Sequence, residues 1–292
     1  MENKQVKQNL SLQLKDGRQI GFAECGDPNG SPVFYFHGFP GSRLEACRFH
    51  DIAITHQFRL ISIDRPGIGL STIDKNRSIL SFATDVANFA DCLGIEKFSL
   101  IGYSSGAPFV AACAYAIPDR INSVAIVSGM GPFEKPESQM GLAREQKIAN
   151  RLIKTIPPLL TLMVWLLYKI LKKPNKLLVQ LIKQLPEVDQ AIMLDPRNQM
   201  GIINNTSETF RNGVYGPTQE IKLLLKPWGF DLEQISCPVT IWYGTLDRQV
   251  PISHARIYAN LIPNAQLKIV ENEGHHSLIK KHMQEIMSSL RI

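Results

Sequence analysis

The sequence has no apolar run long enough to cross a membrane. Its most apolar window, residues 159–168, holds only 10 residues, well short of the roughly 20 that a spanning helix needs. The first residues, 1–8, are polar and lack the apolar core of a secretory signal. We therefore expect a cytoplasmic protein with no transmembrane segment.

The sequence also has few cysteines, and they do not cluster. Their number, five, is odd, they lie far apart, and most have apolar neighbours. This distribution fits reduced thiols in a core better than a disulfide framework or a metal cluster. We expect structural roles for Cys25, Cys47, Cys92, Cys113 and Cys237, and no metal site.

Signatures of nucleic-acid binding are missing as well, although the net charge is +6. Nearly all of the excess lies between residues 133 and 232, which contain 14 Lys and Arg and 9 Asp and Glu. No RNP-like, zinc-finger or helix-turn-helix pattern accompanies these charges. We therefore expect no nucleic-acid partner.

What is present is an alternation of strand-like and helix-like segments, in a chain long enough for one core with an insertion. The first two strand-like segments flank Asp16-Gly17 and predict a β-hairpin. The later ones are short apolar runs, as in parallel strands that are buried on both faces. The order predicts an α/β fold with helices on both sides of the sheet. We predict strands at 10–14, 19–24, 33–36, 59–63, 98–101, 123–127, 238–243 and 266–270, and helices at 81–93, 107–117, 254–261 and 278–290.

The stretch from 133 to 232 interrupts this alternation, because it has almost no strand pattern and indicates several helices. We predict a core formed by 1–132 and 233–292, with a helical insertion at 133–232. Apolar residues recur at helical spacing from 177 to 185, which most often indicates core packing. The alternative is a lid that covers an apolar substrate pocket, or that contacts a membrane surface through Lys169, Lys172, Lys173 and Lys176.

One short motif points to chemistry. Residues 102–106 are Gly-Tyr-Ser-Ser-Gly, the G-x-S-x-G pattern in which a serine occupies a sharp turn between a strand and a helix. A strand-like run precedes it, and a small-residue, helix-compatible segment follows. Gly102 and Gly106 remove side chains that would otherwise collide at the turn. We therefore predict that Ser104 is a nucleophile.

A serine hydroxyl needs a base, usually histidine, and a group that orients the histidine. The last strand-like run leads to Gly274-His275-His276, which places a histidine in a loop at the end of a strand. Only one of these histidines can serve, because adjacent side chains diverge. The first acid beyond the preceding strand is Asp247. Serine, aspartate and histidine then follow the chain order that is typical of a triad on this type of sheet.

An oxyanion intermediate needs backbone N–H donors. One is expected from Ser105, the residue after the nucleophile. The other is expected from the loop after the third strand, where residues 37–42 are His-Gly-Phe-Pro-Gly-Ser and Phe39 has the donor position. Pro40 has no N–H, and we interpret His37 as a hydrogen-bonding brace for this loop.

Together these motifs resemble the α/β-hydrolase superfamily, in its serine-nucleophile, carboxylesterase-like branch with a helical lid. The resemblance covers nearly the whole chain and includes the Asp-Arg-Pro-Gly-Ile-Gly-Leu-Ser turn at 64–71, which in this family shapes the site. It implies a mostly parallel eight-stranded sheet with helices on both faces and a helical cap inserted after the sixth strand. It also implies an acyl-enzyme reaction without metal or organic cofactor, and it places the base at His275.

Two features of the sequence argue against particular branches of this superfamily. Serine at 104 argues against the branches that resemble haloalkane dehalogenases and epoxide hydrolases, which use aspartate there. The loop at 37–42 lacks the consecutive glycines of the proline-iminopeptidase branch, which argues against peptidase activity.

We therefore expect a serine hydrolase that cleaves carboxylic esters of an apolar small molecule. A thioesterase, a lactonase, a C–C hydrolase or a cofactor-free haloperoxidase would use the same residues. The alternative from another class is a non-catalytic small-molecule sensor, because a fold does not imply an activity. The sequence indicates no oligomeric state.

Overall fold

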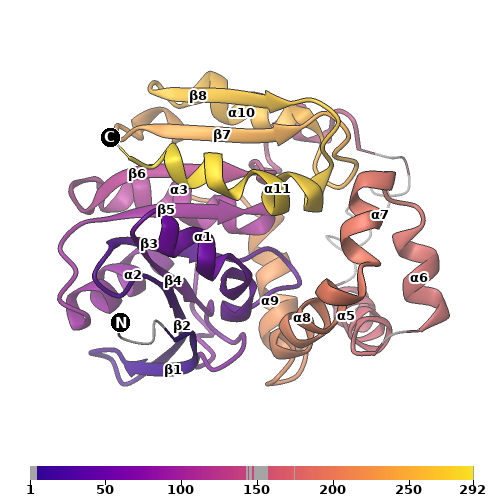
Figure 1. The fold of residues 1–292 in the computed structure, drawn as a ribbon, viewed down its shortest axis with the longest axis horizontal. Coiled ribbons are helices and arrows are strands. Elements are labelled where there is room, and N and C mark those ends of the chain that lie inside the picture. The colour runs from indigo at the N-terminus through magenta and orange to yellow at the C-terminus, as the bar shows by residue number, and fades with distance from the viewer. Residues whose placement is uncertain (1–4, 143, 145–146, 148–156, 174, 292) are drawn as a thin grey trace.

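An eight-stranded sheet forms the centre of the molecule (Figure 1). The structure is a computed structural model and describes residues 5–142, 144, 147, 157–173 and 175–291. The strands are β1 (Lys7–Gln13), β2 (Gln19–Gly26), β3 (Ser31–Phe36), β4 (Phe58–Ile63), β5 (Phe98–Tyr103), β6 (Ile121–Val127), β7 (Val239–Gly244) and β8 (Ala265–Val270). Their order is β1-β2-β4-β3-β5-β6-β7-β8, and only the pairs that include β2 are antiparallel. The predicted α/β sheet is confirmed.

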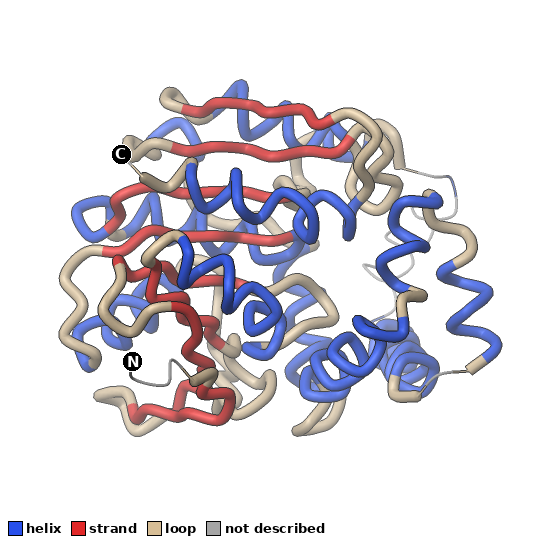
Figure 2. The backbone as a smooth tube through the Cα atoms, viewed as in Figure 1, coloured by secondary structure: helices blue, strands red, loops and turns tan. Residues whose placement is uncertain are grey.

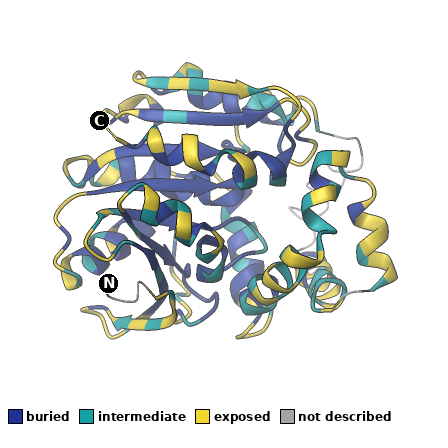
Figure 3. Ribbon diagram, in the orientation of Figure 1, coloured by how far each residue is buried: buried dark blue, intermediate teal, exposed yellow. Residues whose placement is uncertain are grey.

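The central strands are buried on both faces, as their continuous apolar runs predict (Figure 3). In β3, Val33 and Tyr35 belong to one hydrophobic core, and Phe34 and Phe36 belong to another. Neighbouring side chains of a strand point to opposite faces of a sheet. One core therefore lies on each side of the sheet.

Helices cover both cores (Figure 2). They are α1 (His50–Thr55), α2 (Ser81–Cys92), α3 (Ala107–Ala116), α10 (Ile252–Leu261) and α11 (His275–Ser288). Residues of α2, α3 and α10 belong to the core with Phe34, and residues of α1 and α11 belong to the core with Tyr35. All were predicted except α1, which follows a 3-10 helix at Arg43–Phe49 that was not predicted either.

Between β6 and β7, the described residues form helices joined by turns and loops and include no strand, and we call residues 133–232 the insertion. Its described residues include the α-helices α5 (Pro157–Leu171), α6 (Lys176–Ile182), α7 (Glu187–Met193), α8 (Pro196–Thr209) and α9 (Tyr215–Leu224). Figure 1 shows α6, α7 and α8 beyond the carboxyl ends of β5, β7 and β8. Residues 143, 145–146, 148–156 and 174 of the predicted insertion lie outside the described residues. That the insertion acts as a cap stays a prediction.

Among the described residues, the apolar helix α5 is buried on one face and exposed on another. Leu160 and Val164 are buried against Phe210, which follows α8. On the other face, the side chains of Leu162 and Trp165 are exposed. Within the described residues, no helix combines the length and the apolar composition that crossing a bilayer requires.

All five cysteines are free thiols. Cys25, Cys113 and Cys237 are buried, and Cys47 is half-buried. Cys92 is exposed at the end of α2, so the expectation of a core position was wrong for this residue.

Charged side chains of the insertion reach into the core. Glu220 of α9 pairs with Arg65 at 2.6 Å, and both side chains are fully buried. Glu208 of α8 pairs with the buried Arg43, also at 2.6 Å. Asp189 of α7 is fully buried and accepts backbone hydrogen bonds from the start of α11. The insertion is therefore joined to the core by acidic groups that little solvent reaches.

Candidate active site

Ser104 occupies a sharp turn between β5 and α3. Its φ of 53° lies in the left-handed region, where a non-glycine residue costs on the order of 1–3 kcal/mol and where residues of active sites are often found. An ideal Cβ on Gly102 would lie 2.6 Å from Cγ2 of Val110, and one on Gly106 would collide with the carbonyl oxygen of Phe36. Both glycines are therefore required by packing, as the motif predicts.

His275 and Asp247 form a buried pair. Nδ1 of His275 lies 2.8 Å from Oδ2 of Asp247, and the two side chains are 4% and 0% exposed. The other oxygen of Asp247 accepts hydrogen bonds from the N–H groups of Gln249 and Val250, both at 2.9 Å. These bonds fix the carboxylate, which in turn orients the imidazole. With Nδ1 bonded to the carboxylate, Nε2 is the nitrogen available for proton transfer.

The two adjacent histidines have different environments. Burial lowers the pKa of His275, but the charge and hydrogen bond of Asp247 outweigh it and raise the pKa above its ordinary value. Burial and the neighbouring His275 hold the pKa of His276 well below its ordinary value. Nδ1 of His276 lies 3.0 Å from the hydroxyl of Tyr103, and its Nε2 lies 2.9 Å from the amide nitrogen of Gln249. Asp247 is therefore paired with His275 and not with His276.

The loop after β3 lies against the serine. An ideal Cβ on Gly38 would be 3.4 Å from Cβ of Ser104. The N–H of Gly38 donates to Oε2 of Glu45 at 2.8 Å, which fixes the loop. Among the described residues, no hydrogen bond uses the N–H of Phe39, the first predicted oxyanion donor. Ser105, the second predicted donor, is buried directly after the serine.

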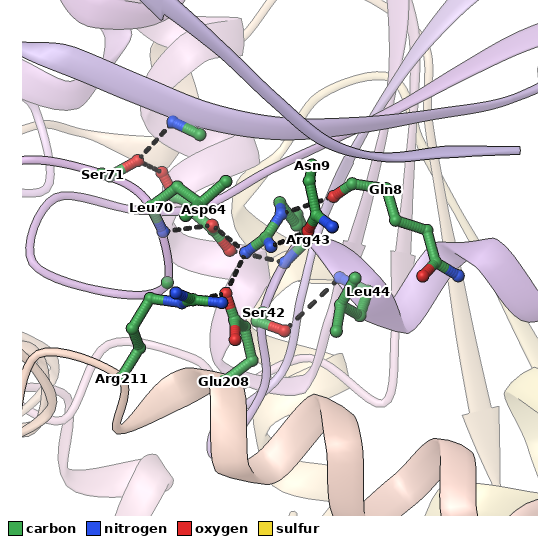
Figure 4. A network of polar contacts seen from close by, with 12 residues as sticks. Gln8, Asn9, Ser42, Arg43, Leu44, Asp64, Leu70, Ser71, Glu208 and Arg211 are labelled. Atoms are coloured by element: carbon green, nitrogen blue, oxygen red, sulfur yellow. Dashed lines mark hydrogen bonds and ion pairs between the residues drawn. The ribbon is translucent and has the colours of Figure 1, made fainter.

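Arg65 connects the loop after β3 to the predicted turn at 64–71. Its Nη1 donates to the carbonyl of His37 at 2.7 Å, and its Nη2 lies 3.0 Å from Nδ1 of His37. Burial, helped by the charge of Arg65, holds the pKa of His37 well below its ordinary value, which agrees with its interpretation as a brace. In the same turn, Asp64 accepts hydrogen bonds from the N–H groups of Arg43 at 2.6 Å and Leu70 at 2.9 Å (Figure 4).

The predicted site residues gather at one edge of the sheet. Phe39, Ser104, Asp247 and His275 each follow the carboxyl end of a parallel strand, namely β3, β5, β7 and β8. The ring of Tyr103, next to the serine, lies 5.1 Å from the ring of His275. Among the hydrogen bonds of the described residues, none joins the Ser104 hydroxyl to His275.

One prediction at the site was wrong. The sequence placed His275 in a loop before a helix at 278–290, whereas α11 begins at His275 itself. The helix begins early because its first N–H groups have acceptors: Gly274 donates to Oγ of Ser277, and the next three N–H groups donate to Asp189. No local pattern reveals this contact, since Asp189 precedes His275 by 86 positions. Asp189 is the residue of this site that reasoning from the sequence missed.

Comparisons with known proteins identify the family. A family model described as alpha/beta hydrolase fold matches residues 31–282. The chain belongs to this family. This α/β hydrolase is 28% identical to the proline iminopeptidase of Xylella fastidiosa over 120 residues, which are 39% of this chain and 37% of that relative. The match therefore spans little more than a third of the relative's length.

This α/β hydrolase shares its fold with solved structures along nearly its whole length. The bromoperoxidase from Bacillus anthracis has a TM-score of 0.69 and 18% identity, over 97% of this chain and 98% of that one. The esterase EaEST from Exiguobacterium antarcticum has a TM-score of 0.68 and 18% identity, over 97% of both chains. At these identities the likeness shows the fold alone.

Proposed function

We propose that this α/β hydrolase is a serine hydrolase that cleaves carboxylic esters through an acyl-enzyme intermediate. Oγ of Ser104 attacks the carbonyl carbon while Nε2 of His275 takes the hydroxyl proton, and Asp247 stabilises the imidazolium. The N–H groups of Phe39 and Ser105 stabilise the oxyanion. The bond from carbon to the leaving alkoxide oxygen then breaks, and His275 protonates that oxygen. Water, activated by the same imidazole, releases the acid and restores the serine.

One observation carries the proposal: the buried 2.8 Å bond between His275 and Asp247, at the sheet edge where Ser104 has a strained backbone. A raised pKa suits an imidazole that must take a proton from a weakly acidic hydroxyl. The fold, which this chain shares with an esterase and with a bromoperoxidase, supports an enzyme and does not choose between these two reactions. The reaction as written needs no metal or organic cofactor.

The insertion, residues 133–232, is proposed to act as a cap over a pocket for an apolar small molecule. Asp189 supports this assignment, because it brings α7 to the start of α11 and thus beside His275. The position of α6 to α8 beyond the carboxyl ends of the strands is the second support (Figure 1). Substrate class would then be set by the insertion and not by the core.

Labelling with a fluorophosphonate tests the nucleophile. The intact mass of the wild-type protein is expected to increase by one phosphonyl group, and Ser104→Ala is expected to stay unlabelled. Ser128→Ala is the matched control, because Ser128 follows β6 at the same sheet edge, is buried and also has a positive φ, of 46°. This control is expected to be labelled like the wild type. No adduct on the wild type, or an equal adduct on Ser104→Ala, rejects the proposal.

A substrate panel tests the bond that is cleaved. Turnover of p-nitrophenyl esters of graded chain length is expected to fall by on the order of 10³ or more in Ser104→Ala, His275→Ala and Asp247→Ala. His276→Ala is expected to lose less, since the ring nitrogens of His276 bond to Tyr103 and Gln249. Faster turnover of acyl-CoA, lactone or C–C substrates, or bromination, would reassign the bond. If the protein binds a small molecule and Ser104→Ala leaves turnover unchanged, the protein is a sensor and not this hydrolase.

A weak contact with an anionic membrane surface is proposed for α5 and α6. Residues 157–185 contain five lysines and no acidic residue, and Leu162, Trp165 and Leu177 are exposed among them. Nζ of Lys169 lies 5.1 Å from the centroid of the Trp165 ring. Basic and apolar groups on one helical face favour the interface of an anionic bilayer. Cosedimentation with phosphatidylserine vesicles is expected above that with phosphatidylcholine vesicles, and background binding to both would refute this proposal.

A further inference from the structure

Asp189 contacts the backbone of the helix that carries His275. The residue lies in α7 of the insertion and is fully buried. Its Oδ2 accepts the N–H of His275 at 2.9 Å, and its Oδ1 accepts those of His276 at 2.9 Å and Ser277 at 2.8 Å. One carboxylate from the insertion therefore satisfies three consecutive donors of the core.

These three donors belong to the first turn of α11, where N–H groups have no partner within the helix. The residue before the helix usually provides an acceptor with its side chain, but that residue here is Gly274, which has none. An ideal Cβ on Gly274 would lie 2.6 Å from Cγ of Asp189. The missing side chain thus leaves the space that the carboxylate of Asp189 occupies.

We propose that Asp189 is a positioning residue for His275, through which the insertion sets the orientation of the imidazole. The proposal rests on the proposed function, in which His275 is the base. Because His275 is the first residue of α11, a change at the start of this helix moves the imidazole directly. A displacement of about 1 Å at a reacting group can reduce a rate by roughly 100-fold.

The charge of Asp189 also acts on the imidazole. Burial lowers the pKa of His275, whereas Asp247, Asp189 and Glu45 raise it, and the net result lies above the ordinary value. The rings of Tyr103 and His276 lie 5.1 and 5.2 Å from the ring of His275. The titratable groups that act on or lie beside the imidazole are therefore Asp247, Asp189, Glu45 and Tyr103 from other segments, and His276 from α11 itself.

Asp189→Asn tests the inference, because it keeps the shape of the side chain and removes its charge. With p-nitrophenyl butyrate as the probe, we expect kcat to fall by about 10- to 100-fold with little change in KM. The acid limb of kcat/KM, which reports the base in the free enzyme, is expected to move to lower pH, because a negative charge near His275 has been removed. A purely structural role for Asp189 would lower the melting temperature and leave this limb unmoved.

Gly274→Ala tests the same contact from the core side. The φ of −99° at Gly274 suits alanine, so the added methyl acts by pushing the Asp189 carboxylate away from α11. The same shift of the acid limb and a lower kcat are expected. This variant carries the test if Asp189→Asn does not fold.

Glu208→Gln is the matched control. It also removes a negative charge that joins the insertion to the core, but this charge pairs with Arg43 and not with the start of α11. It is expected to leave the acid limb unmoved. Ser104→Ala separates this inference from the proposed function: if Ser104→Ala retains turnover, the proposed function fails. If Ser104→Ala is inactive while Asp189→Asn and Gly274→Ala keep the wild-type kcat and acid limb, the role of Asp189 is overturned.

Discussion

Removing the charge of Glu220 is expected to destabilise the protein by about 3–5 kcal/mol. Nε of Arg65 donates to Oε2 of Glu220 at 2.8 Å, and Nη2 donates to Oε1 at 2.6 Å, with both side chains 0% exposed. Glu220→Gln keeps the shape of the side chain but leaves a guanidinium buried without a counter-charge. Nη1 of Arg77, which lies 3.8 Å from Glu220, loses the same partner.

Comparing a single with a double variant separates the effect of the unpaired charge from the loss of contacts. Glu220→Leu alone leaves Arg65 unpaired, whereas Glu220→Leu with Arg65→Met removes both charges, so the double variant is expected to be more stable than Glu220→Leu. The recovery is expected to be partial, because Arg65 also donates to the carbonyl of His37 at 2.7 Å. Arg197→Met is the control: it removes a 2.7 Å ion pair with Asp195 whose arginine is 90% exposed, and the urea midpoint should not move.

Urea unfolding at neutral pH, followed by circular dichroism with the m-values compared, measures these changes. A Glu220→Gln variant within about 1 kcal/mol of the wild type would show that the buried pair contributes little. A double variant less stable than Glu220→Leu would contradict the argument that the unpaired charge dominates.

Three further predictions use the same unfolding assay. Gly106→Ala is expected to destabilise by about 1–3 kcal/mol, because its φ of −73° suits alanine but its Cβ would meet the Phe36 carbonyl; wild-type stability would refute this. Gly201→Ala, in α8 with nothing within 4 Å of an added Cβ, is expected to stabilise by roughly 0.5–1 kcal/mol, and a loss would count against it. Burial lowers the pKa of His254 from 6.5 to about 4. Between these pH values the unfolded state binds a proton and the folded state does not, so the stability of the fold decreases as the pH is lowered, by about 3 kcal/mol in total. His254→Asn keeps an acceptor for the Gly131 N–H, which lies 2.7 Å from Nδ1, and should lose less stability on acidification; identical pH dependence in both proteins would contradict the assignment.

Features that one segment determines were predictable from the sequence. β5 is a run of buried residues that ends in a turn with two required glycines, and both properties follow from local composition. The same holds for the position of Asp247 after β7, because the first acid beyond a buried strand comes to the edge of the sheet. The catalytic roles of Ser104, His275 and Asp247 stay predictions until the labelling and substrate experiments are done.

Features that join distant segments were not predictable. The start of α11 was placed three residues too late, because the acceptor for its first N–H groups is Asp189 in the insertion. The pairing of Arg65 with Glu220 joins residues 155 positions apart, and neither residue stands in a pattern that indicates its partner. Hydrophobic periodicity indicates which side chains are buried, whereas the partner of a buried charge depends on the tertiary structure.

The acidic groups that extend from the insertion into the core restrict how this enzyme can be re-engineered. A foreign segment spliced between β6 and β7 would have to supply carboxylates for Arg43, for Arg65 and for the start of α11 at the same time. A chimera without them would leave Arg65 buried without a counter-charge, would leave Arg43 with Asp64 alone, and would leave the first N–H groups of α11, next to His275, without an acceptor. New selectivity should therefore be easier to reach by point changes inside the existing segment than by transplanting another.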